Sequence, residues 1–256
     1  MFANERQDII WNMLQTEGAV TTTKLMEQFD VSIETVRRDL LTMEKSGRLT
    51  RVHGGAVAKS DMKPYKELAQ RNKEFSDEKY QLSRKAMEFI SEGDIIGIDS
   101  GSTAIYFAEV LKERFSKLTC ITHSMDVFQT LSNYKEFSVI LCGGHFIREE
   151  NAFYGELTRN MLSCLHMQKA FVFPTAISLE HGIFDYQKEL YQIQKQMIKS
   201  ADKIFVLADS SKYEKTGFLK LGETESDHVY ITDSLLPEAI VKLYKENGIT
   251  VHTMKA

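Results

Sequence analysis

Residues 20–56 read VTTTKLMEQFDVSIETVRRDLLTMEKSGRLTRVHGGA, and this stretch decides the fold of the N-terminal part of the chain. Leu25 and Phe29 mark a short helix, and Ser32 is a good N-cap for a second helix after a three-residue turn. Gly47 is placed to end that second helix, and the residues after it predict a strand and a glycine-closed turn. This order of elements is the layout of a winged helix-turn-helix, a fold that binds duplex DNA.

The helix that follows Ser32 has one apolar face and one polar face. Val36, Leu40 and Met43 recur at i, i+4 and i+7, so they face a core. The opposite face would enter the major groove, where arginines pair with guanine or phosphate, while the hairpin reaches the backbone or the minor groove. The residues predicted to contact DNA are Ser32, Glu34, Thr35, Arg37 and Arg38 on the helix, and Arg51, His53 and Gly54 on the hairpin.

Charge counts limit the extent of the DNA-binding surface. Residues 1–60 contain eight Lys/Arg and eight Asp/Glu, so the DNA footprint must be a local basic face with modest non-specific affinity. In a plainer interpretation, Arg37 and Arg38 are ordinary surface charges of a small three-helix domain. The apolar register, the cap, the helix stop and the Gly-Gly turn together favour DNA binding.

Length and composition fit two domains. The chain has 256 residues and a net charge of −4, nearly all of which lies after residue 60. We expect a DNA-binding domain at residues 1–57, a connector at 58–75 and an α/β domain at 76–256. The sequence shows no apolar stretch of membrane-spanning length and no signal peptide, so we expect a cytoplasmic protein. The three cysteines lack Cys-x-x-Cys spacing, and we expect no disulfide, metal or cofactor.

From residue 76 onward, the sequence alternates helices with short apolar strands. Ser76 is a candidate N-cap for a helix whose inner face carries Leu82, Ala86, Met87 and Ile90. The alternation predicts a three-layer α/β/α domain with a mostly parallel sheet covered on both faces. The predicted strands are Ile95–Ile98 (wholly buried), Leu118–Thr122, Ser138–Leu141, Ala170–Phe173, Ile204–Leu207 and Val229–Ile231, and the predicted helices lie near 103–114, 125–132, 156–164, 188–200 and 237–247.

Small and polar residues gather where these strands end. In parallel sheets, ligands bind beyond the carboxyl ends of the strands, and hydroxyls with free helical amides suit phosphate. Each cluster alone fits an ordinary loop with capping residues equally well, but several clusters on one side of a sheet favour a phosphorylated small molecule. The predicted effector-binding residues are Asp99, Ser100, Gly101, Ser102, Thr103, His123, Gly143, Gly144, Asp209 and Lys212.

The first domain resembles the N-terminal signature of the DeoR family of bacterial transcription regulators, at VSIETVRRDL (31–40) and RVHGGA (51–56). The second resembles that family's sugar-phosphate sensor domain, of the ribose-phosphate-isomerase-like type, at GDIIGIDSGST (93–103) and LADSSK (207–212). The resemblance implies a repressor of a carbohydrate uptake or metabolism operon whose DNA affinity responds to a phosphorylated sugar or polyol. Because two-fold DNA readers usually bind as dimers, we expect a homodimer or higher homo-oligomer on double-stranded operator DNA.

The chain departs from the family pattern at three places near the predicted pocket. Residues 173–176 are Phe-Pro-Thr-Ala, with Pro174 among them, where the family often has glycines. His123 replaces an asparagine, and Leu190 and Tyr191 replace a Glu-Ala pair. These departures bear on the identity of the effector, whereas the fold tolerates them.

Two other functions use the same residues. A sugar-phosphate isomerase fused to a DNA-binding domain would use Asp99, His123, Asp209 and Lys212 as acid and base groups for enediol chemistry. Alternatively, the second domain only oligomerises and binds no small molecule. Sensing needs the same polar groups without turnover, so we expect a regulator and not an enzyme.

Overall fold

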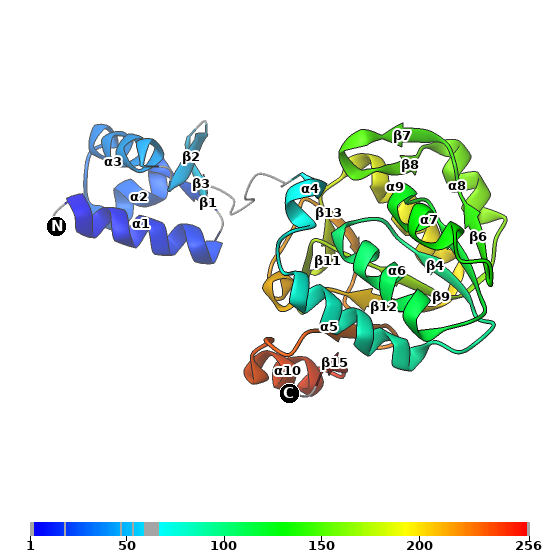
Figure 1. Ribbon diagram of the computed structural model, residues 1–256. Coiled ribbons are helices and arrows are strands. Elements are labelled where there is room, and N and C mark those ends of the chain that lie inside the picture. Colours follow the sequence, from blue (N-terminus) through cyan, green and yellow to red (C-terminus); the bar gives the residue numbers. More distant parts are fainter. Residues whose placement is uncertain (1–2, 18, 47, 53, 59–66, 255–256) are drawn as a thin grey trace. The chain divides into compact units, whose positions relative to one another are not determined.

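The chain folds into two compact units, Met1–Tyr65 and Lys66–Ala256 (Figure 1). Each unit has its own hydrophobic core, as a domain requires to fold by itself. In the described part of the chain, no helix has the length and apolar character to cross a bilayer. The computed structural model describes residues 3–17, 19–46, 48–52, 54–58 and 67–254.

The first unit confirms the predicted winged helix-turn-helix fold. Three helices enclose a core, and the hairpin after the third helix pairs with an additional strand that was not predicted, giving the strand order β1-β3-β2. Side chains from all three helices and the hairpin are buried because their apolar residues recur at helical spacing. The elements are α1 (Ala3–Glu17), β1 (Ala19–Thr21), α2 (Thr22–Phe29), α3 (Ile33–Lys45), β2 (Leu49–Val52) and β3 (Gly55–Ala58).

Polar side chains set the limits of the two central helices. The Thr21 hydroxyl accepts a hydrogen bond from the Lys24 amide at 3.2 Å and begins α2. Asp30 ends α2 in the left-handed conformation, with φ of 50°. The Ser32 hydroxyl then accepts from the Thr35 amide at 3.4 Å, which confirms the predicted cap of α3. The predicted helix stop, Gly47, lies outside the described residues.

A seven-stranded sheet forms the centre of the second unit, and all of its strands are parallel. The strand order β15-β14-β12-β9-β4-β5-β6 places β4, the first of these strands in the chain, near the middle. The strands are β4 (Ile95–Ile98), β5 (Leu118–Thr122), β6 (Phe137–Leu141), β9 (Met167–Val172), β12 (Ala201–Leu207), β14 (Val229–Thr232) and β15 (Val251–Thr253).

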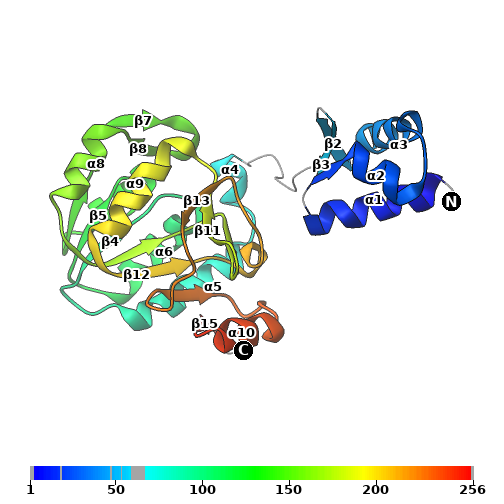
Figure 2. The ribbon, with the colours of Figure 1, turned by 180° about the vertical axis from the view of Figure 1, so that it is seen from behind.

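Helices cover both faces of this sheet, which confirms the predicted three layers. Alternate residues of β12 separate the two cores, since Phe205 and Leu207 join one core and Ile204 and Val206 join the other. Figure 1 shows α5 (Ser76–Ala86), α6 (Ser102–Arg114) and α7 (Met125–Ser132) over the first core, and Figure 2 shows the opposite face. The helices packed on the second core are α8 (Glu156–Ser163), α9 (Lys188–Lys199) and α10 (Glu238–Glu246).

Two details of the sequence prediction are wrong. Ser76 is the first residue of α5 and makes no side-chain cap, because the turn before the helix is made by Phe75 at φ of 54°. Ile95 is exposed and not buried, since it begins β4 at the rim of the sheet. The remaining apolar residues of β4 are buried as predicted.

The second unit also contains elements that were not predicted. The expected connector, 58–75, includes a short helix, α4 (Leu68–Arg71), while residues 59–66 lie outside the described residues. Five short strands form two small antiparallel sheets. They are β7 (His145–Ile147), β8 (Ala152–Tyr154), β10 (Ala176–Ser178), β11 (Gly182–Asp185) and β13 (Leu219–Gly222).

Candidate DNA-binding face and effector site

The polar face of α3 is accessible along its first two turns. Glu34, Arg37 and Arg38 are exposed, Thr35 is half-buried, and Ser32 is exposed at the helix N-terminus. The opposite face is buried in the core. This places two guanidinium groups and the first free amides of the helix on one side, the arrangement with which such helices meet bases and phosphates.

A buried ion pair fixes the orientation of this helix. Asp39 is 5% exposed, and its carboxylate accepts from Arg6 Nε at 2.7 Å and from Arg6 Nη2 at 3.2 Å. Arg6 lies on α1, so the two-pronged contact joins the first helix to the recognition helix. Because a bidentate guanidinium–carboxylate contact is directional, it limits rotation of α3 about its own axis.

The hairpin is attached to both α2 and α3. The Arg51 amide donates to Glu44 Oε1 at 2.9 Å, and Arg51 Nη1 lies 4.0 Å from Glu44 Oε2. At the turn, the Gly54 carbonyl accepts from the Thr22 amide at 2.8 Å and from the Thr22 hydroxyl at 3.0 Å. The hairpin is therefore held against the helices, and the exposed Arg51 side chain extends from it.

Two adjacent glycines are required by the hairpin for different reasons. Gly54 has φ of +83°, a left-handed conformation that favours glycine in this turn. Gly55 lies so close to β1 that a Cβ there would be 2.1 Å from the Val20 carbonyl oxygen. Of the other predicted hairpin residues, His53 lies outside the described residues.

Asp99 and His123 form a buried pair where β4 and β5 end. His123 Nε2 lies 2.9 Å from Asp99 Oδ1, and both residues are fully buried. His123 Nδ1 lies 2.9 Å from the Phe153 carbonyl oxygen, which can only accept, so Nδ1 carries a proton. His123, one of the departures from the family pattern, is thus joined to the first predicted effector residue.

The start of α6 has the features of a phosphate cradle. Gly101 precedes the helix with φ of +121°, and the helix begins at Ser102. The Thr103 side chain is 1% exposed, and its hydroxyl has no hydrogen-bond partner among the described residues. Buried hydroxyls are normally paired, so this unpaired oxygen departs from the usual pattern. Ser100 is also buried, and its amide donates to Asp99 Oδ1 at 2.8 Å.

Gln194 joins Asp99 to a carboxylate that was not predicted. Its amide nitrogen donates to Asp99 Oδ2 at 3.1 Å and also contacts Asp185 Oδ2. Burial raises the pKa of Asp185 to about 6, and the charge of Asp99 adds to this effect, whereas the Gln194 hydrogen bond opposes it. Gln194 is a polar residue on the buried face of α9, beside Leu190 and Ile193. A polar residue on an otherwise apolar face was the sequence feature that could have indicated its role.

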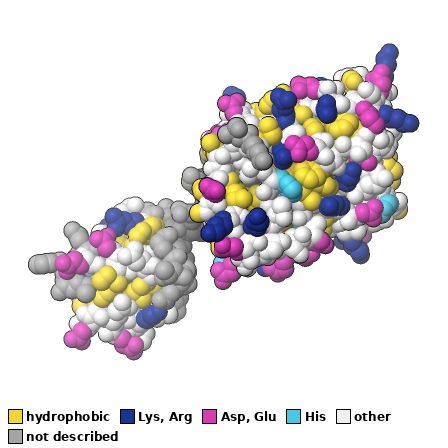
Figure 3. Space-filling model, turned by 90° about the horizontal axis from the view of Figure 1, so that it is seen from below, with side chains coloured by type: hydrophobic (Ala, Val, Ile, Leu, Met, Phe, Trp, Pro, Cys, Tyr) yellow, Lys and Arg dark blue, Asp and Glu magenta, His cyan; other side chains and the backbone are white. Residues whose placement is uncertain are grey.

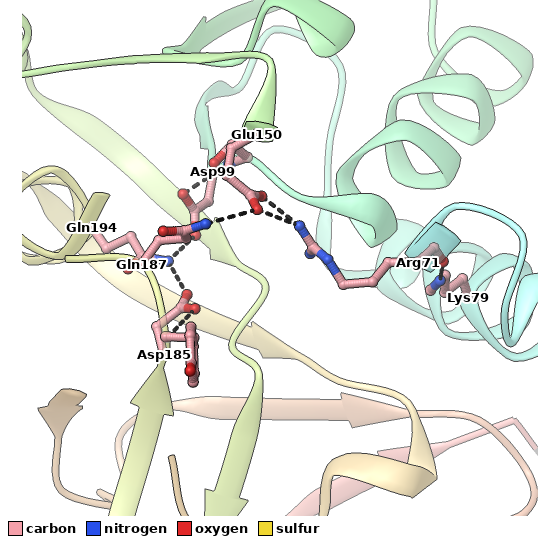
Figure 4. Close-up of polar contacts among 9 residues, drawn as sticks. Arg71, Lys79, Asp99, Glu150, Asp185, Gln187 and Gln194 are labelled. Carbon is pink, nitrogen blue, oxygen red and sulfur yellow. Dashed lines mark hydrogen bonds and ion pairs between the residues drawn. The ribbon is translucent and has the colours of Figure 1, made fainter. Parts of the chain in front are cut away.

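Glu150, after β7, is another buried carboxylate near Asp99 that was not predicted (Figure 4). Glu150 is 2% exposed and accepts from Arg71 Nη2 at 2.7 Å and 2.5 Å through its two oxygens. Gln187 Nε2 donates to Glu150 Oε1 at 3.3 Å. Figure 4 shows these side chains converging near Asp99. Arg71 comes from α4, in the expected connector, and its local sequence gave no signal for a role in the site.

The loop after β12 brings the remaining predicted charges together. Lys212 Nζ lies 3.7 Å from Asp209 Oδ2, and the Asp209 Oδ1 atom accepts from the Ser211 amide at 3.1 Å. Lys79, buried at the start of α5, lies within electrostatic reach of this loop. The pKa of Lys79 is lowered to about 8, chiefly by burial; the nearby charge of Lys212 contributes to this lowering, and Asp209 opposes it.

The predicted glycine pair has a packing role in the structure. A Cβ on Gly144 would be 2.2 Å from the Thr158 hydroxyl and 2.6 Å from the Tyr154 carbonyl oxygen. The Gly143 carbonyl accepts from the same Thr158 hydroxyl at 3.1 Å. These contacts bring α8 close to the loop after β6. Their part in effector binding stays a prediction.

On the face of the second unit drawn in Figure 3, surface charge alone does not indicate where a ligand would bind. Lysine, arginine and acidic side chains are interspersed there with hydrophobic ones. Lys79 lies within electrostatic reach of both Arg71 and Lys212, which pair with Glu150 and Asp209.

The fold and these two sites define a DNA-binding domain joined to an α/β domain with a polar site at the carboxyl ends of its strands. Comparison with known families agrees: residues 6–61 match the DeoR-like helix-turn-helix domain, and residues 74–234 match the DeoR C terminal sensor domain. The chain belongs to the DeoR family of bacterial transcription regulators, as its sequence motifs predicted. It is a DNA-binding regulator and not an enzyme.

Similar proteins include regulators of opposite sign. The lactose phosphotransferase system repressor of Streptococcus mutans is 33% identical over 97% of this chain and 99% of its own length. The L-fucose operon activator of Haemophilus influenzae is 28% identical over 96% and 98%. Among solved structures, ribose 5-phosphate isomerase A of Methanocaldococcus jannaschii aligns with a TM-score of 0.40 and 20% identity over 55% of this chain and 56% of that chain.

Proposed function

We propose that the protein represses an operon for carbohydrate uptake or metabolism, and that a phosphorylated sugar or polyol changes its affinity for operator DNA. The exposed residues of α3 and the hairpin contact the duplex, with Arg37 and Arg38 on bases or phosphates and Arg51 on the backbone. The effector binds where β4, β5 and β12 end. Its phosphate lies at residues 100–103, and its hydroxyls lie near Asp99, Asp209 and Lys212.

One observation carries the effector assignment: buried polar groups from separate elements converge beyond the ends of the parallel strands. Asp99, His123, Gln194 and Asp185 are linked by hydrogen bonds, and each is at most 6% exposed. Burying polar groups costs free energy that hydrogen bonds among them offset only in part, so a buried cluster of this size supports a binding role. Carboxylates and amides bind sugar hydroxyls, and the unpaired Thr103 hydroxyl with the start of α6 suits a phosphate.

The related regulators support the carbohydrate part of the proposal. Their names refer to a lactose phosphotransferase system and to an L-fucose operon. One is a repressor and the other an activator, so a direct test of the sign of regulation belongs with the test of DNA binding.

Two measurements on the full chain test the proposal. The first is a thermal-shift screen with ribose 5-phosphate, glucose 6-phosphate, fructose 1-phosphate and glycerol 3-phosphate, each beside its unphosphorylated counterpart. A binder at a hundred times its dissociation constant adds about 2.7 kcal/mol of apparent stability. The second is selection of duplexes from a random library, followed by fluorescence anisotropy with and without the compound that scores. Sedimentation of the protein–DNA complex gives the number of chains, expected to be two or more.

A chain that selects no duplex would contradict the DNA-binding proposal. Selection of a duplex without a response to any phosphorylated compound would leave a regulator whose second domain serves only for assembly. Repression or activation is then read from a reporter gene placed behind the selected duplex.

A further inference from the structure

Arg71 has an unusual position for a residue so near the DNA-binding domain in sequence. Its helix, α4, begins only ten residues after β3 ends at Ala58. Its guanidinium nevertheless reaches Glu150 beside Asp99 and Gln187, among the polar side chains of the proposed effector site (Figure 4). Arg71 therefore places a cation from α4 next to the buried carboxylates of the proposed effector site.

Several polar contacts and one buried leucine hold α4 and the residues after it on the second unit. Leu68 is buried, and the Tyr106 hydroxyl donates to the Asn72 carbonyl at 2.7 Å. Lys79 Nζ donates to the Glu74 carbonyl at 2.5 Å and also to the Arg71 carbonyl. Tyr106 lies on α6, whose first turn is the proposed phosphate cradle. A cavity of about 440 Å³ runs beside α4, with Asn72 and Asn151 among its lining residues. Polar contacts and the buried Leu68 thus hold this segment, and the cavity lies beside it.

We propose that Arg71 is an effector-binding residue and that a sugar phosphate acts by exchanging the partners of the Arg71–Glu150 pair. The phosphate takes the Arg71 guanidinium, and a sugar hydroxyl donates to the Glu150 carboxylate. The inference rests on the proposed function and adds to it the residue through which the effector reaches α4.

The chemistry of the pair explains why the ligand needs both groups. Guanidinium forms its strongest hydrogen bonds with carboxylate and phosphate, and a phosphate carries the greater negative charge. Removal of Arg71 alone would leave the buried Glu150 with the Gln187 amide as its one remaining hydrogen-bond donor among the described residues, and a poorly paired buried carboxylate is costly. A ligand with a phosphate and a nearby hydroxyl pairs both groups, whereas inorganic phosphate pairs only the cation and an unphosphorylated sugar only the carboxylate.

The exchange also gives a physical route from effector to DNA. Arg71 belongs to α4, the first described helix of the second unit, so a new partner for its side chain shifts the position or the freedom of that helix. A ligand changes DNA affinity only if it interacts differently with the two arrangements, and the guanidinium supplies that difference.

Inorganic phosphate and the scoring sugar phosphate are the probes for the test, with thermal shift of the full chain as the readout. R71A should weaken binding of both by about tenfold or more, and R71K by less, because an ammonium keeps charge but not the planar donor set. E150Q should strengthen binding of inorganic phosphate about threefold or more, since a neutral amide competes less for the guanidinium. In anisotropy, E150Q without effector should already shift DNA affinity in the direction that the effector shifts the parent.

The matched controls are D94N and K169A, which alter another partly buried ion pair, between the residue before β4 and β9. They should leave phosphate affinity unchanged.

A merely structural pair would lower thermal stability in R71A and E150Q without moving phosphate affinity in opposite directions. Equal phosphate affinity in R71A and the parent, or weaker affinity in E150Q, overturns the exchange. If K212A blunts sugar-phosphate binding while R71A does not, this inference fails and the proposed effector site stands. If the parent binds neither probe, both fail.

Discussion

Arg6 on the first helix grips Asp39 on the recognition helix through two nitrogens, at 2.7 Å and 3.2 Å, although 33 residues separate them. Asp39 directly follows Arg37 and Arg38 in sequence, and it points into the core while they point out. The buried carboxylate therefore fixes which face of α3 is exposed. Orientation of the proposed DNA-contacting arginines depends on a residue that itself contacts no DNA.

Removing this carboxylate should destabilise the first unit. D39A leaves Arg6 buried without its main partner, and breaking a buried pair in this way costs about 3–5 kcal/mol. Denaturant unfolding followed by circular dichroism should show an early transition that the parent lacks, with sugar-phosphate binding by the second unit retained. D8N is the control, because Asp8 is 74% exposed and lies 3.6 Å from Arg48. Equal stability of D39A and D8N would contradict the structural role.

Loss of the exposed arginines should weaken DNA binding without unfolding the domain. R37A and R38A each remove a guanidinium from the exposed face of α3, and each should cost about 1–3 kcal/mol of operator affinity. The readout is an anisotropy titration with the selected duplex. K45A, an exposed change at the other end of the same helix, should bind like the parent. A double R37A/R38A variant that binds as tightly as K45A would refute the assigned face.

The two hairpin glycines should respond differently to a side chain. In G54A the new Cβ meets open space, so the cost is that of a left-handed backbone, about 1–2 kcal/mol. In G55A the Cβ would be 2.1 Å from the Val20 carbonyl oxygen, so β1 must separate from β3 and the loss should be larger. Valine at both positions should abolish DNA binding and spare sugar-phosphate binding. Loss of both activities would mean that the hairpin supports the whole molecule. G248A is the control, because Gly248 also has a positive φ, of +79°, with open space for a Cβ, and it lies in the second unit away from both proposed sites.

Periodicity and capping chemistry predicted most of the fold. β5 and α7 begin and end where the pattern placed them, and the Ser32 cap of α3 is present. The short antiparallel strands were missed, since β10 and β11 have three and four residues and every one of them is buried, so no alternation marks them. Phe75 took the turn that Ser76 was expected to make, because a left-handed phenylalanine has no sequence signature.

The candidate site was predicted only where strands end in recognisable motifs. Asp99, His123, Asp209 and Lys212 follow such strands, and the structure brings Asp99 to His123 and Asp209 to Lys212. Gln194, Asp185, Glu150 and Arg71 come from a helix interior, a four-residue strand, a loop and the expected connector. Only tertiary packing brings these four to the same place, and single-sequence periodicity carries no information about it.

Titration of Asp185 should give the folded protein a specific pH dependence. Its pKa is about 6 in the folded chain against 3.8 ordinarily, because of burial, so the folded state holds more protons between these values. Stability therefore falls as pH rises from about 4 to about 6, by up to roughly 3 kcal/mol for a two-unit shift. Thermal melts of D185N should lose this fall relative to the parent. D227N, at an exposed carboxylate, should keep it. Parallel pH curves for D185N and the parent would contradict the assignment.

Removing the Lys212 amine should separate sensing from DNA binding. Lys212 Nζ lies 3.7 Å from Asp209, in the loop where we place the effector's hydroxyls, whereas the proposed DNA-contacting residues belong to the other unit. K212A should therefore bind operator nearly as the parent does. Its response to the scoring sugar phosphate should shrink by most of the usual coupling of about 1–3 kcal/mol, or 5- to 150-fold in affinity. K203A, at an exposed lysine near the amino end of β12, the strand that precedes this loop, should respond normally. Anisotropy of labelled operator across an effector titration gives both quantities at once. A K212A response equal to the parent's in midpoint and amplitude would remove Lys212 from the effector site. Loss of a cation that contacts the effector's phosphate or hydroxyls must change either the midpoint or the amplitude of the titration.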